Sequence, residues 1–263
     1  MLKRELKINF KGLIIWAVVL LGIYLLVFAI YPSLMTEETK QTLEVMLESM
    51  PKEILSTFNM DIVGIESAFG WFKTEGYLFL TLIGGLYAAI LGGTILLKEE
   101  SDKTIEFLAA KPVSREKIVT AKILCGIINI AIFTAIVSAG NWIALANTED
   151  FNANQFWMIS LLPLLLYYLF FFISLIISTL MKKSKKAMTI GIGLVFISYF
   201  LQIIGGMGEN TEWIKSISLF EFASARYIVL NNEINMVYVW IGLGIIALCT
   251  IGTYYRYHQK EFK

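Results

Sequence analysis

The sequence predicts an all-α protein that crosses a membrane six times, with both termini in the cytoplasm. Hydrophobic residues make up 57% of the 263-residue chain and charged residues 16%, whereas a soluble domain carries about 25% charged residues. Six uncharged runs each reach the length of roughly 20 residues that a helix needs to span a bilayer. Lysines and arginines gather in alternate segments between these runs, as the positive-inside rule requires.

The uncharged runs fix where the spanning helices are expected. The spans lie at about 12–31, 76–97, 120–146, 157–181, 187–207 and 235–256, and residues 1–263 form one transmembrane domain. Lipid offers no partner to exposed backbone groups, so each run should be helical. None of the runs shows the alternation of a barrel strand. Pro163 lies inside the fourth run and predicts a kink or a late helix start there.

Two polar segments flank the first span. Residues 1–11 carry four basic residues, and Leu2, Leu6 and Phe10 recur at helical spacing, which predicts a short amphipathic elbow on the membrane surface. The outer loop 32–73 carries seven acidic residues. Its apolar residues predict a short extracellular amphipathic helix before Pro51, formed around Leu43, Met46, Leu47 and Met50, and a second one around Ile54, Leu55 and Phe58.

The orientation follows from the basic residues. Segments 1–11, 98–122, 182–186 and 256–263 hold 17 of the 22 lysines and arginines. Cytoplasmic loops carry such an excess, so these four segments should face the cytoplasm. Both termini are therefore expected on the inner side.

The segment 98–122 is the only long charged stretch expected on the inner side. It holds eleven charged residues, and Ile105, Leu108 and Ala109 form a small apolar face at helical spacing. We expect a cytosolic loop at 98–119 with a short helix that presses its apolar side against the bundle or a soluble partner. A solvated connector without further function is an equally good interpretation of the composition.

Catalytic and cofactor motifs are missing from the sequence. No Gly-Lys pair occurs, so there is no phosphate-binding loop. One histidine and two separated cysteines indicate neither a metal site nor a disulfide framework. Ser114 begins a Ser-x-x-Lys sequence, but its position after Pro112 favours the N-cap of the third span. We expect no enzyme activity and no cofactor in this chain, and the net charge of +1 indicates no nucleic-acid partner.

Small residues recur along the second span. Gly85, Ala89 and Gly93 lie four residues apart, a spacing that lets two helix backbones approach closely. The contact can lie within the chain or between two chains. Polar side chains inside the spans are few, and Asn129, Asn141 and Gln202 are expected to join helices rather than bind a ligand.

The cytosolic stretch resembles the loop of ABC-2 type transporter permeases. The resemblance rests on Glu99-Glu100, Thr104-Ile105-Glu106, Phe107-Leu108, Pro112-Val113-Ser114-Arg115, Ile118-Val119 and Lys122. It extends to the basic N-terminus, the large first outer loop, the six spans and the basic C-terminus. Lys103 stands where the family often has glycine.

The resemblance implies a multi-pass permease subunit of the cell membrane, an exporter whose chain forms the translocation path. A second permease chain, identical or homologous, membrane lipid and two copies of a cytosolic ATP-binding subunit would be its partners, and Mg-ATP would bind to that subunit. The implied ATPase-coupling interface comprises Glu99, Glu100, Thr104, Ile105, Glu106, Phe107, Leu108, Pro112 and Arg115.

Two other functions fit parts of the sequence. A membrane scaffold or sensor subunit that transports nothing would share every feature above. A stand-alone carrier fits less well, because the cores of the spans contain no acidic or basic residue, and ion-coupled carriers usually need such residues. Association with an ATP-binding protein separates the permease from the scaffold.

Overall fold

The computed structural model describes residues 1–34, 36–51, 55, 67–101, 114–148 and 150–260. These residues form helices and no strand. Six helical stretches are long and apolar enough to cross a membrane, which confirms the predicted fold class. Their ranges are Leu2–Ser33, Ala68–Ile95, Arg115–Leu145, Ala153–Leu180, Ser184–Gly206 and Met236–Gln259.

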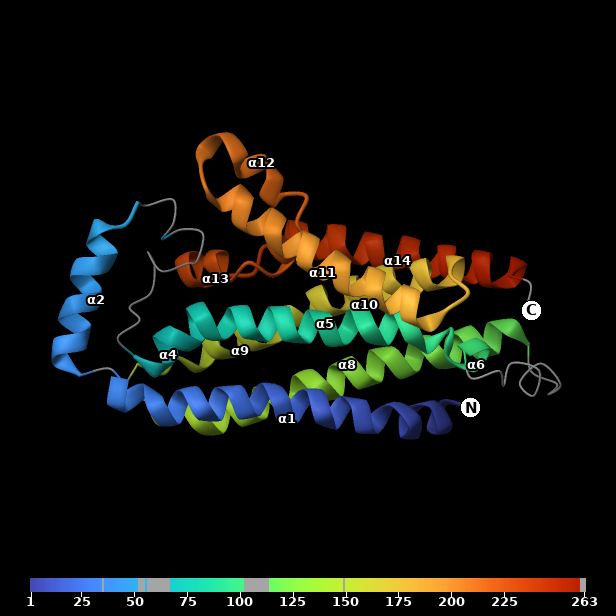
Figure 1. Ribbon diagram of the computed structural model, residues 1–263, viewed down its shortest axis with the longest axis horizontal. Coiled ribbons are helices and arrows are strands. Elements are labelled where there is room, and N and C mark those ends of the chain that lie inside the picture. Colours follow the sequence, from blue (N-terminus) through green and yellow to red (C-terminus); the bar gives the residue numbers. More distant parts are fainter. Residues whose placement is uncertain (35, 52–54, 56–66, 102–113, 149, 261–263) are drawn as a thin grey trace.

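The long helices run side by side, and both termini lie at the same end of the bundle (Figure 1). The helix α1 (Leu2–Leu34) packs along α8 (Arg115–Leu145), and α5 (Tyr77–Ile95) packs against α10 (Pro163–Leu180) and α11 (Ser184–Gly206). The last span, α14 (Met236–Gln259), covers α10. An even number of spans requires the two termini to share one side, as the sequence predicts.

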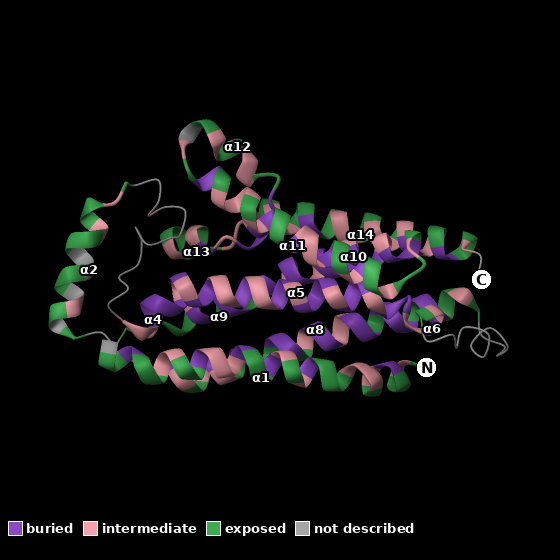
Figure 2. Cartoon of the chain, in the orientation of Figure 1, coloured by how far each residue is buried: buried purple, intermediate pink, exposed green. Residues whose placement is uncertain are grey.

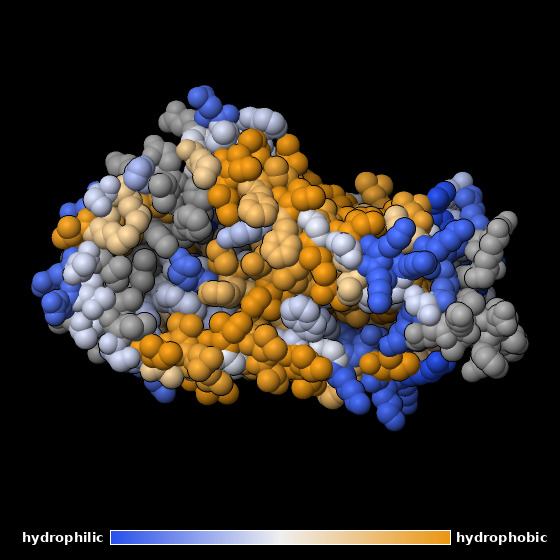
Figure 3. Space-filling view, viewed as in Figure 1, coloured by the Kyte–Doolittle hydropathy of each residue, from blue (hydrophilic) through white to orange (hydrophobic). Residues whose placement is uncertain are grey.

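Burial divides the bundle into a core and a shell. More than half of the residues of α5 and of α10 are buried, whereas α1, α11 and α14 expose large apolar side chains (Figure 2). On the face shown in Figure 3, apolar side chains form a broad band between two hydrophilic ends. This pattern fits a bundle whose outer helices face lipid.

The first eleven residues correct one sequence prediction. They do not form a separate elbow, because α1 runs without interruption from Leu2 to Leu34. Nothing between Lys11 and Gly12 breaks the helix, and the buried carboxylate of Glu5 holds the first turns of α1 against α8. The basic rim of these turns therefore extends the first span.

Several predicted helix ends are confirmed. Pro163 occupies the first turn of α10 and separates it from α9 (Ala153–Leu161), because proline fits the first turn and not the interior. Ser114 caps α8 and accepts a hydrogen bond from the Lys117 amide. The helix predicted before Pro51 is present as α2 (Glu37–Ser49), which stands apart from the bundle (Figure 1). The second extracellular helix predicted around Ile54 and Phe58 falls largely outside the described residues.

The second span begins earlier than its charges suggest. A short helix α4 (Ala68–Trp71) and a π-helical turn η1 (Phe72–Gly76) lead into α5 without a break. Lys73 lies in this stretch with its Nζ atom 4.7 Å from the ring centroid of Phe69, a cation–π contact. The uncharged run at 76–97 therefore predicted only the part of this helical stretch that lies in the apolar core, and not its first residues.

The small residues of α5 let it approach its two neighbours closely. A Cβ atom on Gly92 would overlap the backbone carbonyl of Phe171 in α10, and one on Gly93 would lie 3.0 Å from the carbonyl oxygen of Ala187 in α11. In turn, a Cβ atom on Gly191 of α11 would lie 3.1 Å from the carbonyl oxygen of Ala89. These backbone contacts make α5, α10 and α11 a tightly packed unit.

The first prediction tests this packing. Gly92→Ala should lower the stability of the purified protein by about 1–3 kcal/mol, because the added methyl group meets backbone that has no room to move. The shift in thermal unfolding midpoint measures the effect. Gly193→Ala is the control, since a Cβ atom there meets nothing within 4 Å. Equal midpoints for the two variants would contradict the close α5–α10 contact.

The second prediction tests the orientation. In a background without Cys125 and Cys249, Lys185→Cys should react only with thiol reagents that cross the membrane, because it lies in the basic segment 182–186, at the start of α11. Asn154→Cys, at the start of α9, should react with impermeant reagents on intact cells. Both positions are exposed, so the reversed labelling pattern would place the loop 98–119 outside.

Candidate functional site

A cluster of buried charges lies at the end of the bundle where the two termini lie (Figure 1). The Lys122 side chain on α8 is fully buried, with its Nζ atom 2.7 Å from Glu99 Oε2 and 3.6 Å from Glu5 Oε2. It also donates a hydrogen bond of 2.5 Å to the carbonyl oxygen of Ile95. Glu5 belongs to α1, Ile95 ends α5, and Glu99 belongs to the short helix α6 (Lys98–Ser101). One ammonium group thus joins four helices.

The burial of this cluster makes its members interdependent. Moving an ion from water into a protein interior costs several kcal/mol unless opposite charges and hydrogen bonds compensate. Lys122 has two carboxylates and a carbonyl around it. Without the ammonium, Glu5 and Glu99 would be left as two buried like charges. The ion pairs therefore hold the helix ends in one arrangement.

Arg115, the first residue of α8, binds the end of the last span. Its Nη1 atom donates hydrogen bonds to the carbonyl oxygens of Tyr257, His258 and Lys260, at 3.4, 2.7 and 2.8 Å. These carbonyls lie at the C-terminus of α14, where backbone acceptors have no partner within the helix. A cation at this position also complements the helix dipole. The beginning of α8 is thereby fixed to the end of α14.

Lys260 continues the network toward the middle of the chain. Its Nζ atom lies 2.8 Å from Glu100 Oε1 and donates a hydrogen bond of 3.1 Å to the carbonyl oxygen of Met181, which caps α10. The Ser184 amide at the start of α11 donates to Ser101 Oγ at 3.2 Å. Together with Lys122 and Arg115, these contacts connect α6 and the start of α8 to all six spans.

The predicted coupling residues divide into two groups. Glu99, Glu100 and Arg115 lie in the described part, and the structure brings them into the network above. The other six residues, Thr104, Ile105, Glu106, Phe107, Leu108 and Pro112, lie outside the described residues, so the predicted short helix around them stays a prediction. The helices on either side of the segment 102–113, α6 and α8, are both fixed to the bundle.

Sequence reasoning missed the charge at the centre of the network. Lys122 belongs to the stretch that resembles the family loop, but it was not predicted as a site residue, and Glu5 was expected only as part of the surface elbow. The position of Lys122 could have marked it as a buried charge, because it lies two turns inside α8 and directly before an uncharged run. A lysine at that depth needs a carboxylate partner, yet the sequence does not say which one.

The predicted small-residue face lies within the chain. Gly85, Ala89 and Gly93 are buried, and a Cβ atom on Gly85 would lie 3.1 Å from the Phe170 ring of α10. The structure thus places these residues at contacts between α5 and its own neighbours. The pairing of two permease chains stays a prediction, and the surface that would carry it lies elsewhere.

Comparison with known proteins decides the family. The family model of the ABC-2 family transporter protein matches residues 2–262, essentially the whole chain. The chain belongs to the ABC-2 transporter family. Neither the curated proteins nor the solved structures gave a match. The ABC-2 protein is accordingly a multi-pass membrane permease of an ABC transporter, and the network joins the helices that flank its loop between the second and third spans to the rest of the bundle.

The third prediction concerns the centre of this network in the ABC-2 permease. Lys122→Met keeps the length of the side chain but leaves Glu5 and Glu99 buried without their cation. We expect a loss of about 3–5 kcal/mol in stability, measured as a lowered unfolding midpoint. Lys117→Met on the exposed side of the same helix is the matched control and should change little.

A second measurement separates charge from size. The triple variant with Glu5→Gln, Glu99→Gln and Lys122→Met removes all three charges and should recover part of the lost stability, because no unpaired ion remains buried. If Lys122→Met alone is as stable as the parent, the cluster does not hold the helix ends together.

Proposed function

We propose that this ABC-2 permease forms the translocation path of an exporter in the cell membrane. A separate cytosolic subunit binds and hydrolyses Mg-ATP and drives the movement, in two copies that pair with two permease chains. The direction follows from the family resemblance, in which export predominates. The loop 98–119 is the proposed docking site of the ATP-binding subunit.

The network that reaches all six spans is the observation that carries this proposal. A permease without its own ATPase motif must receive mechanical work from another protein. Such work is transmitted only if the element that receives it is rigidly joined to the helices that move. The segment 102–113 lies between α6 and α8, and Lys122, Arg115 and Lys260 join these flanking helices to the other spans. A solvated connector would need none of these contacts.

Docking itself would rest on the apolar and charged residues of the loop. Ile105, Phe107 and Leu108 would supply buried apolar contact, and Glu106 would orient the loop through charged hydrogen bonds. Aromatic side chains are common anchors at protein interfaces, whereas charged groups add specificity more than affinity. Glu100 already pairs with Lys260, so it would act on the ATPase indirectly, by holding α6 in place.

The fourth prediction tests the docking role. Phe107→Ala should weaken binding of the ATP-binding subunit by about 2 kcal/mol or more, because it removes an interface anchor. The permease should still insert and keep its unfolding midpoint. Co-purification of the ATPase, followed by its transport-stimulated ATP hydrolysis, measures the loss.

The control for this prediction is Phe200→Ala, which removes the same group from an exposed position on α11. It should retain the ATPase like the parent. If Phe107→Ala with Glu106→Ala also retains the ATPase and full transport, the docking role is wrong. If the parent itself binds no ATP-binding protein, the chain is a scaffold or sensor rather than a driven permease.

A further inference from the structure

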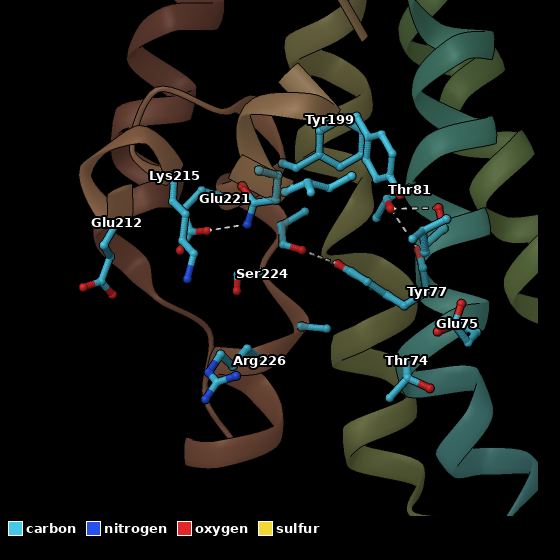
Figure 4. A pocket seen from close by; sticks show the side chains of 16 residues that line it. Thr74, Glu75, Tyr77, Thr81, Tyr199, Glu212, Lys215, Glu221, Ser224 and Arg226 are labelled. Carbon is cyan, nitrogen blue, oxygen red and sulfur yellow. Dashed lines mark hydrogen bonds between the residues drawn. The ribbon is translucent and has the colours of Figure 1, made fainter. Parts of the chain in front are cut away.

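A cavity of about 210 Å³ opens at the outer end of the bundle. Its walls come from η1 and the start of α5, from the end of α11, and from the segment 212–226 that follows (Figure 4). By the orientation argued above, this end faces away from the cytoplasm. The charged network described earlier lies at the opposite end, so the cavity belongs to a different site.

The carboxylate of Glu75 enters this cavity from an unusual piece of backbone. Glu75 belongs to the π-helical turn Phe72–Gly76 and is half-buried. Among the described residues, no side chain or backbone group forms a hydrogen bond or an ion pair with its carboxylate. Single π-helical turns inside α-helices occur frequently at functional sites. A half-buried carboxylate without a partner is costly unless a cation reaches it.

A second carboxylate in the cavity is held in place. Gln202 of α11 donates a hydrogen bond of 2.8 Å from Nε2 to Glu221 Oε2, and its own Oε1 atom is buried without a partner. Glu221 belongs to η3 (Leu219–Ala223), which Tyr77 fixes by donating from its hydroxyl to the Ala223 carbonyl at 2.7 Å. Besides the Glu75 carboxylate, the cavity therefore contains the Glu221 carboxylate and the Gln202 Oε1 atom, which lie on a wall fixed by hydrogen bonds.

Aromatic rings form the apolar part of the lining. Tyr199 and Phe220 pack edge to face with their centroids 5.8 Å apart, and both line the cavity. Such rings attract ammonium groups over their faces and apolar groups at their edges. Glu212, Lys215 and Arg226 come from the segment opposite Glu75 (Figure 4). The lining therefore contains three acidic and two basic residues and carries a net negative charge.

We propose that this cavity binds the ammonium end of an amphiphilic ligand, with the cation at Glu75 and the apolar part against Tyr199 and Phe220, while Glu221 adds negative potential from the opposite wall. Two sources share this chemistry: a lipid headgroup with an amine, and a soluble alkyl- or arylammonium compound. The identification of this ligand as the exported cargo, or as a lipid on the path of the cargo, rests on the proposed function. The existence of the binding site does not depend on the proposed function.

The fifth prediction uses three probes of equal shape: 4-phenylbutylamine, 4-phenylbutyrate and 4-phenylbutanol. Calorimetric titrations are carried out on the permease alone, in phosphatidylglycerol nanodiscs, with empty discs subtracted. The amine should bind the parent most tightly. Glu75→Gln should weaken amine binding roughly 10-fold or more, because it removes the charge and keeps the size. Glu233→Gln, an exposed outer-side carboxylate away from the cavity, should bind like the parent.

Glu75→Gln could lower amine binding simply by disturbing the fold, so a second variant tests the same cavity. Glu221→Gln should also weaken amine binding. Unchanged amine affinity in both variants overturns the proposal, and so does equally tight binding of 4-phenylbutyrate. Phe107→Ala should bind the amine like the parent, so failure of ATPase docking and failure of the cavity are distinguished.

Mass spectrometry of co-purified lipid identifies the source. Enrichment of phosphatidylethanolamine over phosphatidylglycerol in the parent, with loss of that enrichment in Glu75→Gln, assigns the site to a lipid headgroup. Amine binding without such enrichment assigns it to a soluble cation.

Discussion

The Lys122 ammonium has no exposed surface, and the arrangement of the helices around it depends on how its charge is compensated. The compensation comes from carboxylates of α1 and α6 and from the last carbonyl of α5. Each partner lies on a different helix, so the one ammonium holds these helices together, and its removal would leave two buried carboxylates without their cation. The relative positions of α1, α5, α6 and α8 at this end of the protein therefore depend on one buried cation.

The other contacts extend that constraint to the rest of the bundle. Arg115 and Lys260 use charged hydrogen bonds to satisfy the carbonyls at the ends of α14 and α10, groups that would otherwise lack partners. Further along the helices the contacts are of another kind: Gly92 and Gly93 bring α5 against the backbones of α10 and α11. In the proposed assembly, a displacement of α6 would move α5, α10 and α11 together, because neither their ends nor their middles can slide independently.

The outer end of the bundle is built differently. Its polar groups line a cavity instead of closing into ion pairs, and Glu75 lies on a π-helical turn with no partner in the described part of the chain. One end of the bundle is fixed by ion pairs, and the other end contains a cavity with polar groups that have no partner in the described part of the chain. This arrangement suits a permease that is driven by an ATPase at one end and binds a ligand at the other. The two ends are linked through α5, which begins beside the cavity and ends at Ile95 in the charge cluster.

The sequence by itself determined the six spans and several helix ends. These are local properties: an uncharged run must be helical in lipid, Ser114 caps the helix that follows it, and Pro163 fits only a first turn. Only the tertiary structure decided which residues meet. Glu5 was read as part of a surface elbow because its partner Lys122 lies on a distant helix, and Glu75, Gln202 and Glu221 come together from three separate elements. Local patterns record how a residue suits its own helix, whereas the pairing of buried charges depends on helix packing that no single stretch of sequence encodes.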